Sequence, residues 1–204
     1  MSSDVSYVNS GRRKQKERTS AALIQAARDL LARGLTPNLE QAAEVASISR
    51  ATAYRYFSNQ RELLVAAQPE VEATSLLGQA PSDDPYERLD AVVLGLAKIL
   101  LDAEASYRAM LRMSLEPDPA ARGDLPLRQG RRFLWIEGAL EPIRDSLPAS
   151  DFGRLVNAIA ASIGIEALVT LIDLAGLEPT QAVDVMRWSA QALLQQALQN
   201  TAVE

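Results

Sequence analysis

Apolar residues recur along the chain at the spacing that brings them to one face of an α-helix. No segment alternates between apolar and polar positions as a half-buried strand does. The first helix is expected from Lys14 to Arg33, and Gly34 follows it as a C-terminal stop. Its apolar face consists of Leu23, Ile24, Ala27, Leu30 and Leu31. The pattern predicts an all-α fold.

Two short helices are expected directly after the first. One runs from Leu39 to Ala46 behind Asn38, and the next runs from Arg50 to Phe57 behind Ser49. Asn and Ser are favourable N-caps because their side-chain oxygens accept hydrogen bonds from the free N–H groups of the first turn. The N-terminal part of the chain is therefore expected to hold three helices.

Six more helices follow, which makes about nine in all. The first begins near Gln60 and is expected to bend at Pro69, because proline has no N–H to support the preceding turn. Three prolines and a glycine predict a loop over residues 116–126, and Pro142 is expected to kink a later helix. The other five helices are expected around residues 89–103, 107–115, 128–147, 150–175 and 179–200.

The helix from Arg50 to Phe57 should have one buried and one exposed face. Ala53 and Phe57 lie four residues apart and are expected to pack on the three-helix core. The exposed face would carry Arg50, Ala51, Tyr54 and Arg55. The two guanidinium groups suit guanine O6 and N7, and the hydroxyls of Thr52, Tyr54 and Tyr56 can reach phosphate oxygens. Two short helices with such a face indicate a helix-turn-helix DNA-binding domain.

Composition narrows the possible chemistry. The chain has no His and no Cys, which excludes His-Cys zinc sites, disulfides, thiol nucleophiles and Ser-His-Asp relays. Residues 1–68 carry ten basic and six acidic side chains, whereas the remaining 136 residues carry 11 basic and 20 acidic ones. A basic N-terminal segment before an acidic remainder suggests that the N-terminal segment binds a polyanion. A run of solvated charges without a partner is an equal alternative.

The stretch from Ala43 to Leu64 resembles the signature of the tetracycline-repressor (TetR) family, with Tyr54-Arg55-Tyr56-Phe57 followed by Asn59, Glu62, Leu63 and Leu64. The match is detailed over residues 14–65, and elsewhere it consists of helix count, length and a long final helix pair. The resemblance implies a homodimeric, ligand-responsive repressor with an N-terminal DNA-binding domain and an all-helical regulatory domain.

The same resemblance implies roles for individual residues. It places Arg50, Ala51 and Arg55 near bases, Thr52, Tyr54 and Tyr56 near the DNA backbone, and Asn38 at a phosphate-binding helix start. Ser47 stands where glycine is usual, so the left-handed conformation implied there costs about 1 kcal/mol more. Gln60 stands where lysine is usual, and that phosphate contact loses its charge unless Arg61 substitutes. Arg18 and the tail Gly11–Lys16 are expected to follow DNA phosphates or the minor groove, or to form a disordered solubilising arm.

The acidic body has no strong site motif. Candidate ligand contacts lie on helices that surround a cavity in similar proteins, although core packing is the alternative for each. They are Tyr107, Met110, Phe133, Trp135, Asn157 and Glu166. Many aliphatic residues suggest a largely apolar effector, and a polar stripe through Ser162, Glu166 and Thr170 on one helix would admit a cationic one.

The last two helices are expected to form the homodimer interface, because they carry more apolar surface than one core needs. The residues expected in it are Ala161, Leu168, Met186 and Leu194. Burial of both helices within one protomer is the alternative.

These observations predict two domains. Residues 1–60 would form the N-terminal arm and helix-turn-helix domain, and residues 61–204 the ligand-binding and dimerisation domain. The expected function is that of a cytoplasmic repressor of a palindromic operator on double-stranded DNA, released by a small-molecule effector. No cofactor, metal, catalytic residue or membrane contact is expected. The alternatives are an α-helical protein-binding adaptor and an enzyme that uses carboxylates such as Glu137, Glu141 and Glu166.

Overall fold

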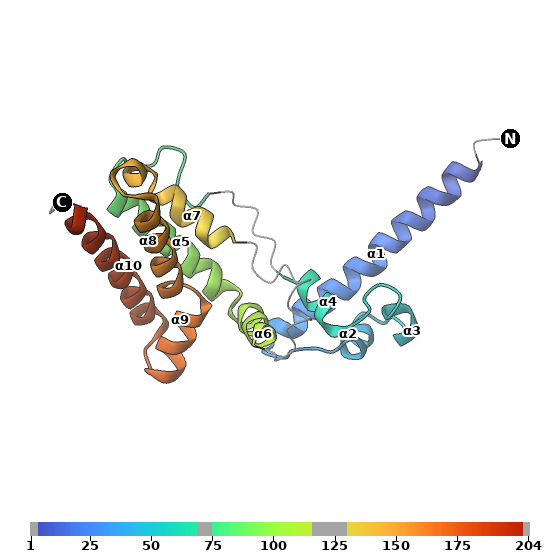
Figure 1. The fold of residues 1–204 in the computed structure, drawn as a ribbon. Coiled ribbons are helices and arrows are strands. Elements are labelled where there is room, and N and C mark those ends of the chain that lie inside the picture. Colours follow the sequence, from blue (N-terminus) through green and yellow to red (C-terminus); the bar gives the residue numbers. More distant parts are fainter. Residues whose placement is uncertain (1–3, 69–74, 116–129, 202–204) are drawn as a thin grey trace. The chain divides into compact units, whose positions relative to one another are not determined.

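A computed structural model describes residues 4–68, 75–115 and 130–201 of the chain. All regular elements in these three ranges are helical, which confirms the all-α prediction (Figure 1). The bend expected at Pro69 and the loop expected over residues 116–126 lie outside the described residues.

The chain divides into two compact units. The first consists of Met1–Glu70 with Arg112–Leu127, and the second of Val71–Leu111 with Arg128–Glu204. The boundary expected at residue 60 therefore falls ten residues too early. The reason lies in a contact of Arg28, whose guanidinium donates to the carbonyls of Ala67 and Gln68 at 3.2 and 3.1 Å and so joins the fourth helix to the first.

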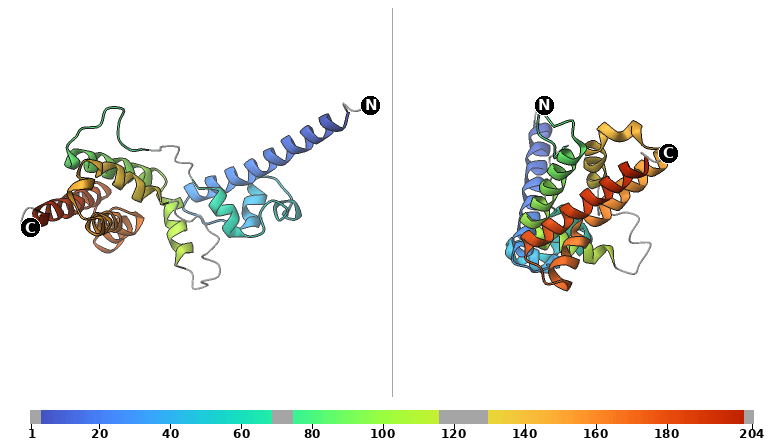
Figure 2. Two further views of the ribbon diagram at one scale, coloured as in Figure 1. Left: turned by 45° about the horizontal axis from the view of Figure 1, so that its top comes forward. Right: turned by 90° about the vertical axis from the view of Figure 1, so that its left-hand side faces the viewer.

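The first unit contains the helices α1 (Asp4–Ala32), α2 (Leu39–Val45), α3 (Arg50–Ala53) and α4 (Gln60–Ala66). Helices α2 and α4 pack on α1, and α3 packs on α2. The first part of α1 extends beyond the rest of this unit (Figure 2). Its core includes the fully buried residues Leu23, Ala27, Ala42, Ala53 and Leu63.

Helix α1 begins ten residues before the predicted start at Lys14. The tail Gly11–Lys16 is helical backbone in the structure and not an extended arm. The sequence pattern missed this part because it marks only helix turns that pack on other elements, and residues 14–18 are exposed.

The predicted N-caps of α2 and α3 are confirmed. The Asn38 side chain accepts from the N–H of Gln41 at 2.8 Å, and the Gln41 side chain accepts from the N–H of Asn38 at 2.8 Å, which makes a capping box. Ser49 accepts from the N–H of Thr52 at 3.3 Å. Helix α3 ends at Ala53, four residues earlier than predicted, because the N–H of Tyr56 bonds three residues back to Ala53 and tightens the chain into a turn.

The second unit contains α5 (Pro85–Asp102), most of α6 (Glu104–Ser114), α7 (Arg131–Ala139), α8 (Ala149–Ser162), α9 (Ile165–Val169) and α10 (Pro179–Thr201). A short 3₁₀ helix, η1 (Glu141–Ser146), follows α7, and a π-helical turn, η2 (Thr170–Leu174), follows α9. Helix α10 packs against both α5 and α8, and α7 packs against α5 and α8 (Figure 1).

Two of the predicted long helices are interrupted. The helix expected at 128–147 ends as an α-helix at Ala139, and Pro142 lies in the first turn of η1, close to the predicted kink. The helix expected at 150–175 is broken at Gly164, whose backbone is extended at φ −88° and ψ −179°. The Arg132 guanidinium of α7 lies next to Gly164, in the space that a Cβ atom at this position would take.

The stretch Ala149–Leu174 is long and apolar enough to cross a membrane by length and composition, and no other stretch of the described ranges is. Of its most apolar window, 44% is buried within the fold. Phe152, Leu155, Ile159 and Leu168 are buried in the core of the second unit, and the break at Gly164 interrupts the helix.

The predicted dimer interface is wrong for three of its four residues. Leu168, Met186 and Leu194 have no exposed surface and belong to the core of their own protomer. The physical reason is that α10 packs against α5 and α8 with Ala182, Met186, Ala190 and Leu194, which share one helix face. Ala161 on α8 is exposed, as an interface residue needs to be.

Candidate nucleic-acid interface

The predicted two-sided character of residues 50–57 is confirmed. Ala53 is fully buried and Phe57 is 8% exposed, whereas the proposed DNA-facing residues are exposed. These exposed residues are Arg50, Ala51, Tyr54 and Arg55. Within the described part of the chain, Arg55 makes no ion pair or side-chain hydrogen bond, so its full guanidinium is available to an external acceptor.

The left-handed conformation at Ser47 orients this face. Ser47 has φ 56°, and the N–H groups of Ser47 and Ile48 bond to the carbonyls of Glu44 and Ala43 at 3.0 and 2.8 Å. This is the Schellman ending of a helix, which turns the chain sharply between α2 and α3. The conformation that the family resemblance implied for Ser47 is therefore present.

Two further candidates flank the exposed face. Thr52 and Tyr56 are half-buried. The Thr52 hydroxyl oxygen accepts from the Ser49 hydroxyl at 2.9 Å, which leaves its own hydrogen free to donate to a phosphate.

The N-termini of α2 and α4 lie close together. Gln60 donates from Nε2 to the carbonyl of Pro37 at 3.0 Å, so it ties the start of α4 to the loop before α2. The Asn38 amide oxygen is used in the capping box, and its two amide hydrogens remain as donors. The starts of the two helices are therefore held next to each other in the first unit.

Arg61 is oriented differently from the sequence expectation. Its Nε and Nη2 atoms are buried without a hydrogen-bond partner, so only Nη1 can meet an external anion in this conformation. It can replace the missing lysine charge only in part. Arg18, by contrast, is exposed on α1.

Glu62 fixes the first turn of α4. Its carboxylate accepts from the N–H of Ser58 at 2.7 Å, and its own N–H donates to Asn59 at 2.9 Å. The bonds from the Ser58 backbone and hydroxyl lower the pKa of Glu62 below its ordinary value of 4.5. The side chain is therefore ionised at neutral pH, and the turn before α4 is held in one conformation.

Sequence reasoning missed Glu40 on α2. Its Oε1 atom lies 2.7 Å from Nη2 of Arg50 and accepts from the Tyr54 hydroxyl at 3.1 Å. The Arg50 guanidinium also lies over the Tyr54 ring, 5.7 Å from its centroid. The signal in the sequence is an acidic residue on the helix that precedes a predicted basic face.

The ligand candidates in the second unit have mixed environments. Met110 and Trp135 are buried, and Tyr107 and Phe133 are half-buried against the core that contains Trp135. Burial raises the pKa of Tyr107, and the Arg131 charge opposes this shift. Asn157 is exposed on α8 and does not point into the interior as expected, because the buried face of α8 is formed by its apolar residues.

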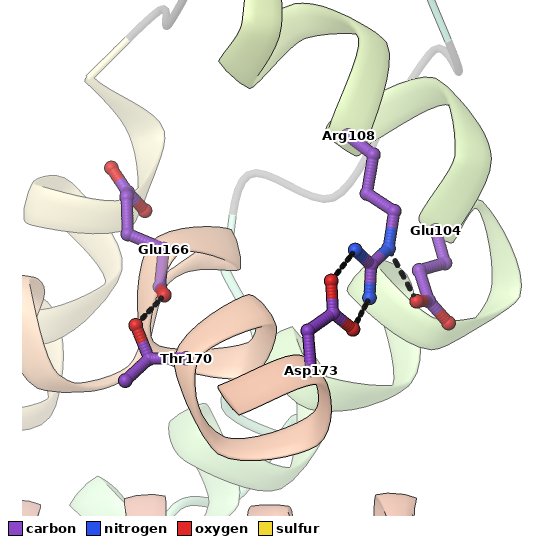
Figure 3. Close-up of polar contacts among 5 residues, drawn as sticks. All are labelled: Glu104, Arg108, Glu166, Thr170 and Asp173. Carbon is purple, nitrogen blue, oxygen red and sulfur yellow. Dashed lines mark hydrogen bonds and ion pairs between the residues drawn. The ribbon is translucent and has the colours of Figure 1, made fainter. Parts of the chain in front are cut away.

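The predicted polar stripe does not form one helix face, because the break at Gly164 separates Ser162 from the other two residues. Ser162 donates to the carbonyl of Ile159 at 2.8 Å. Thr170 donates to the carbonyl of Glu166 at 2.9 Å (Figure 3). The Glu166 carboxylate lies 3.2 Å from Arg132. A cationic effector would have to compete with that arginine.

A second charged cluster joins α6 to η2. Arg108 donates to both oxygens of Asp173 at 2.6 and 2.8 Å and to Glu104 at 2.6 Å (Figure 3). These bonds raise the pKa of Arg108 and lower that of Asp173. Across the described ranges, no group of three or more acidic side chains is arranged to hold a metal ion.

No protein-family model matches the chain, and no curated protein matches it.

Proposed function

We propose that the chain is a DNA-binding transcriptional regulator, a cytoplasmic homodimeric repressor of a palindromic operator that a small-molecule effector releases. In this proposal α2 and α3 form a helix-turn-helix and α3 enters the major groove. The observation that carries it is the exposed face of Arg50, Ala51, Tyr54 and Arg55 on a helix whose other face is buried.

Base reading is assigned to Arg55 and Arg50. A guanidinium can donate two parallel hydrogen bonds to guanine O6 and N7, and the small side chain of Ala51 permits close approach of the helix. Thr52 and Tyr56, the helix start at Asn38, and Arg18 and Arg61 supply contacts to phosphates in this proposal.

The two alternative functions have less support. An enzyme that uses Glu137, Glu141 and Glu166 needs carboxylates that exchange protons, yet each of the three faces an arginine. Arg144 lies 3.8 Å from Glu137 and 2.8 Å from Glu141, and Arg132 pairs with Glu166. A protein-binding adaptor has no evident use for a face with two arginines beside two helix N-termini.

The proposed dimer contact is the outer side of α10. Trp188 is 72% exposed and Val185, three residues before it, is 37% exposed, so both lie on the same helix face. A second copy of the chain would cover this apolar surface. The effector is assigned to the second unit beside Tyr107 and Phe133, and its expected chemistry is largely apolar.

The test of the proposal starts with selection from a randomised double-stranded DNA library, followed by affinity measurements on the enriched duplex. We expect an enriched palindrome and a steep fall of log K with log salt, because several basic side chains per half-site would release counterions. Arg55→Ala should weaken binding by about 1–3 kcal/mol per half-site and relax one base position.

Arg154→Ala is the matched control, because Arg154 is an exposed arginine of the second unit. It removes the same charge away from α3 and should leave sequence preference unchanged. Absence of binding to any duplex, or salt-independent binding, would contradict the proposed function.

A further inference from the structure

Glu40 connects the two helices of the candidate interface through a single atom. Its Oε1 contacts both the cation of Arg50 and the hydroxyl of Tyr54. Glu40 lies in the first turn of α2, and its side chain is 39% exposed, against 71% for Arg50. The ion pair therefore leaves most of the Arg50 side chain exposed.

The contact with Tyr54 limits what that tyrosine can do. A phenol has one hydrogen to donate, and phosphate oxygens only accept. While the Tyr54 hydroxyl donates to Glu40, it cannot donate to a DNA phosphate. In this arrangement the backbone contact expected for Tyr54 is replaced by an internal one.

The contact with Arg50 has two effects. The carboxylate offsets the positive charge of the guanidinium, so Arg50 attracts phosphates less strongly than a free arginine does. The pair with Glu40 and the Tyr54 ring hold the guanidinium from two sides, which leaves its exposed N–H groups in one orientation. An oriented guanidinium suits a base edge, where geometry matters more than charge.

We propose that Glu40 is a positioning residue that raises the sequence discrimination of the interface by acting through Arg50 and Tyr54, at the expense of affinity for arbitrary DNA. This inference rests on the proposed DNA-binding function. Loss of the carboxylate charge frees Arg50 to bind any phosphate within reach, and phosphates carry no sequence information.

The experiment compares wild type with Glu40→Gln on the duplex enriched by wild type and on a scrambled duplex of the same length and composition. The amide keeps the size of the side chain and an oxygen acceptor for Tyr54, and it removes only the charge. We expect about fivefold tighter binding to the scrambled duplex and a salt slope steeper by about 1 per protomer. The ratio of the two affinities should fall by about 5- to 10-fold.

Glu44→Gln is the matched control. Glu44 lies on α2 one turn after Glu40 and is exposed, and no hydrogen bond or ion pair joins its side chain to the described residues of α3. Glu44→Gln removes one negative charge from α2, as Glu40→Gln does. The affinity ratio should remain that of wild type.

Two backgrounds test whether Glu40 acts through its neighbours. In Arg50→Ala, the further change Glu40→Gln should alter the affinity ratio by less than about twofold, because the group to be positioned is gone. In Tyr54→Phe, the further change Glu40→Gln should still lower the affinity ratio, because the amide acts by removing the charge beside Arg50. Thermal unfolding of every variant identifies any that is misfolded.

The outcomes distinguish a failure of the proposed DNA-binding function from a failure of the role assigned to Glu40. If wild type binds no duplex, the proposed function fails and this inference fails with it. If wild type binds selectively but Glu40→Gln behaves as wild type or as Glu44→Gln, or if its effect persists unchanged in Arg50→Ala, only the role of Glu40 is overturned.

Discussion

At the scale of single residues, two helices of the first unit end in the same way but with different residues. Gly34 at the end of α1 has φ 77°, and Ser47 at the end of α2 has φ 56°. The N–H groups of Gly34 and Leu35 bond to the carbonyls of Leu31 and Leu30, the pattern that Ser47 and Ile48 repeat. Glycine adopts this conformation without strain, whereas a Cβ atom there approaches the following carbonyl.

Ser47→Gly is therefore expected to stabilise the first unit. Removal of the Cβ atom relieves about 1 kcal/mol of strain, of which part is offset by the greater freedom of glycine in the unfolded chain. Urea unfolding followed by circular dichroism measures the change. The neighbouring substitution Ala46→Gly is the control, because Ala46 has φ −76° and ψ −4° and gains nothing from glycine. Ala46→Gly should lower the free energy of unfolding. If both glycine substitutions raised it, relief of strain at Ser47 would not be the cause.

Local signals of this kind were readable from the sequence. The caps at Asn38 and Ser49 and the stop at Gly34 depend on atoms within a few residues of each other. A short window of sequence therefore contains both partners of each hydrogen bond. Glu40 could not be found in this way. Its partners are 10 and 14 residues away on another helix, and their meeting depends on the angle that Ser47 sets.

At the scale of elements, Arg108 and Asp173 hold α6 against the π-helical turn η2. The two residues are 65 positions apart and bond through both carboxylate oxygens. A bidentate pair is stronger and more directional than a single contact. At the break at Gly164, the Arg132 guanidinium from another helix lies in the space next to the glycine. Hydrophobic periodicity could not predict either feature, since it records only the neighbours along one helix.

The Arg108–Asp173 pair predicts a pH dependence of stability. The pKa of Asp173 is lowered in the folded state, so its contribution is fully present above the ordinary value of 3.8 and is lost as pH falls below it. Asp173→Asn should lower the urea midpoint at pH 7 and should show a smaller further loss between pH 5 and pH 3 than wild type.

Asp83→Asn is the control for the acid series. Asp83 is exposed in the loop before α5 and has no side-chain partner among the described residues. The urea midpoint of the Asp83→Asn variant should equal that of wild type at every pH. Equal acid sensitivity of wild type and Asp173→Asn would show that other carboxylates dominate.

At the scale of the whole molecule, the sequence predicted that α8 and α10 are apolar but not what covers them. A stripe such as Met186, Ala190 and Leu194 has the same spacing whether it packs inside one protomer or against a second copy. The structure places this stripe in the protomer core. The exposed apolar surface of α10 is on its opposite side, with Val185 and Trp188.

This division predicts opposite results for two charge substitutions on α10. Trp188→Glu should give a folded monomer, because an exposed indole that a partner covers contributes about 4 kcal/mol per copy. Leu194→Asp should unfold the second unit, since a buried carboxylate without a partner costs several kcal/mol. Light scattering after gel filtration measures mass, and circular dichroism measures helix content.

A wild-type monomer would refute the homodimer, and a dimeric Trp188→Glu variant would move its interface elsewhere. A folded Leu194→Asp monomer would instead restore Leu194 to that interface.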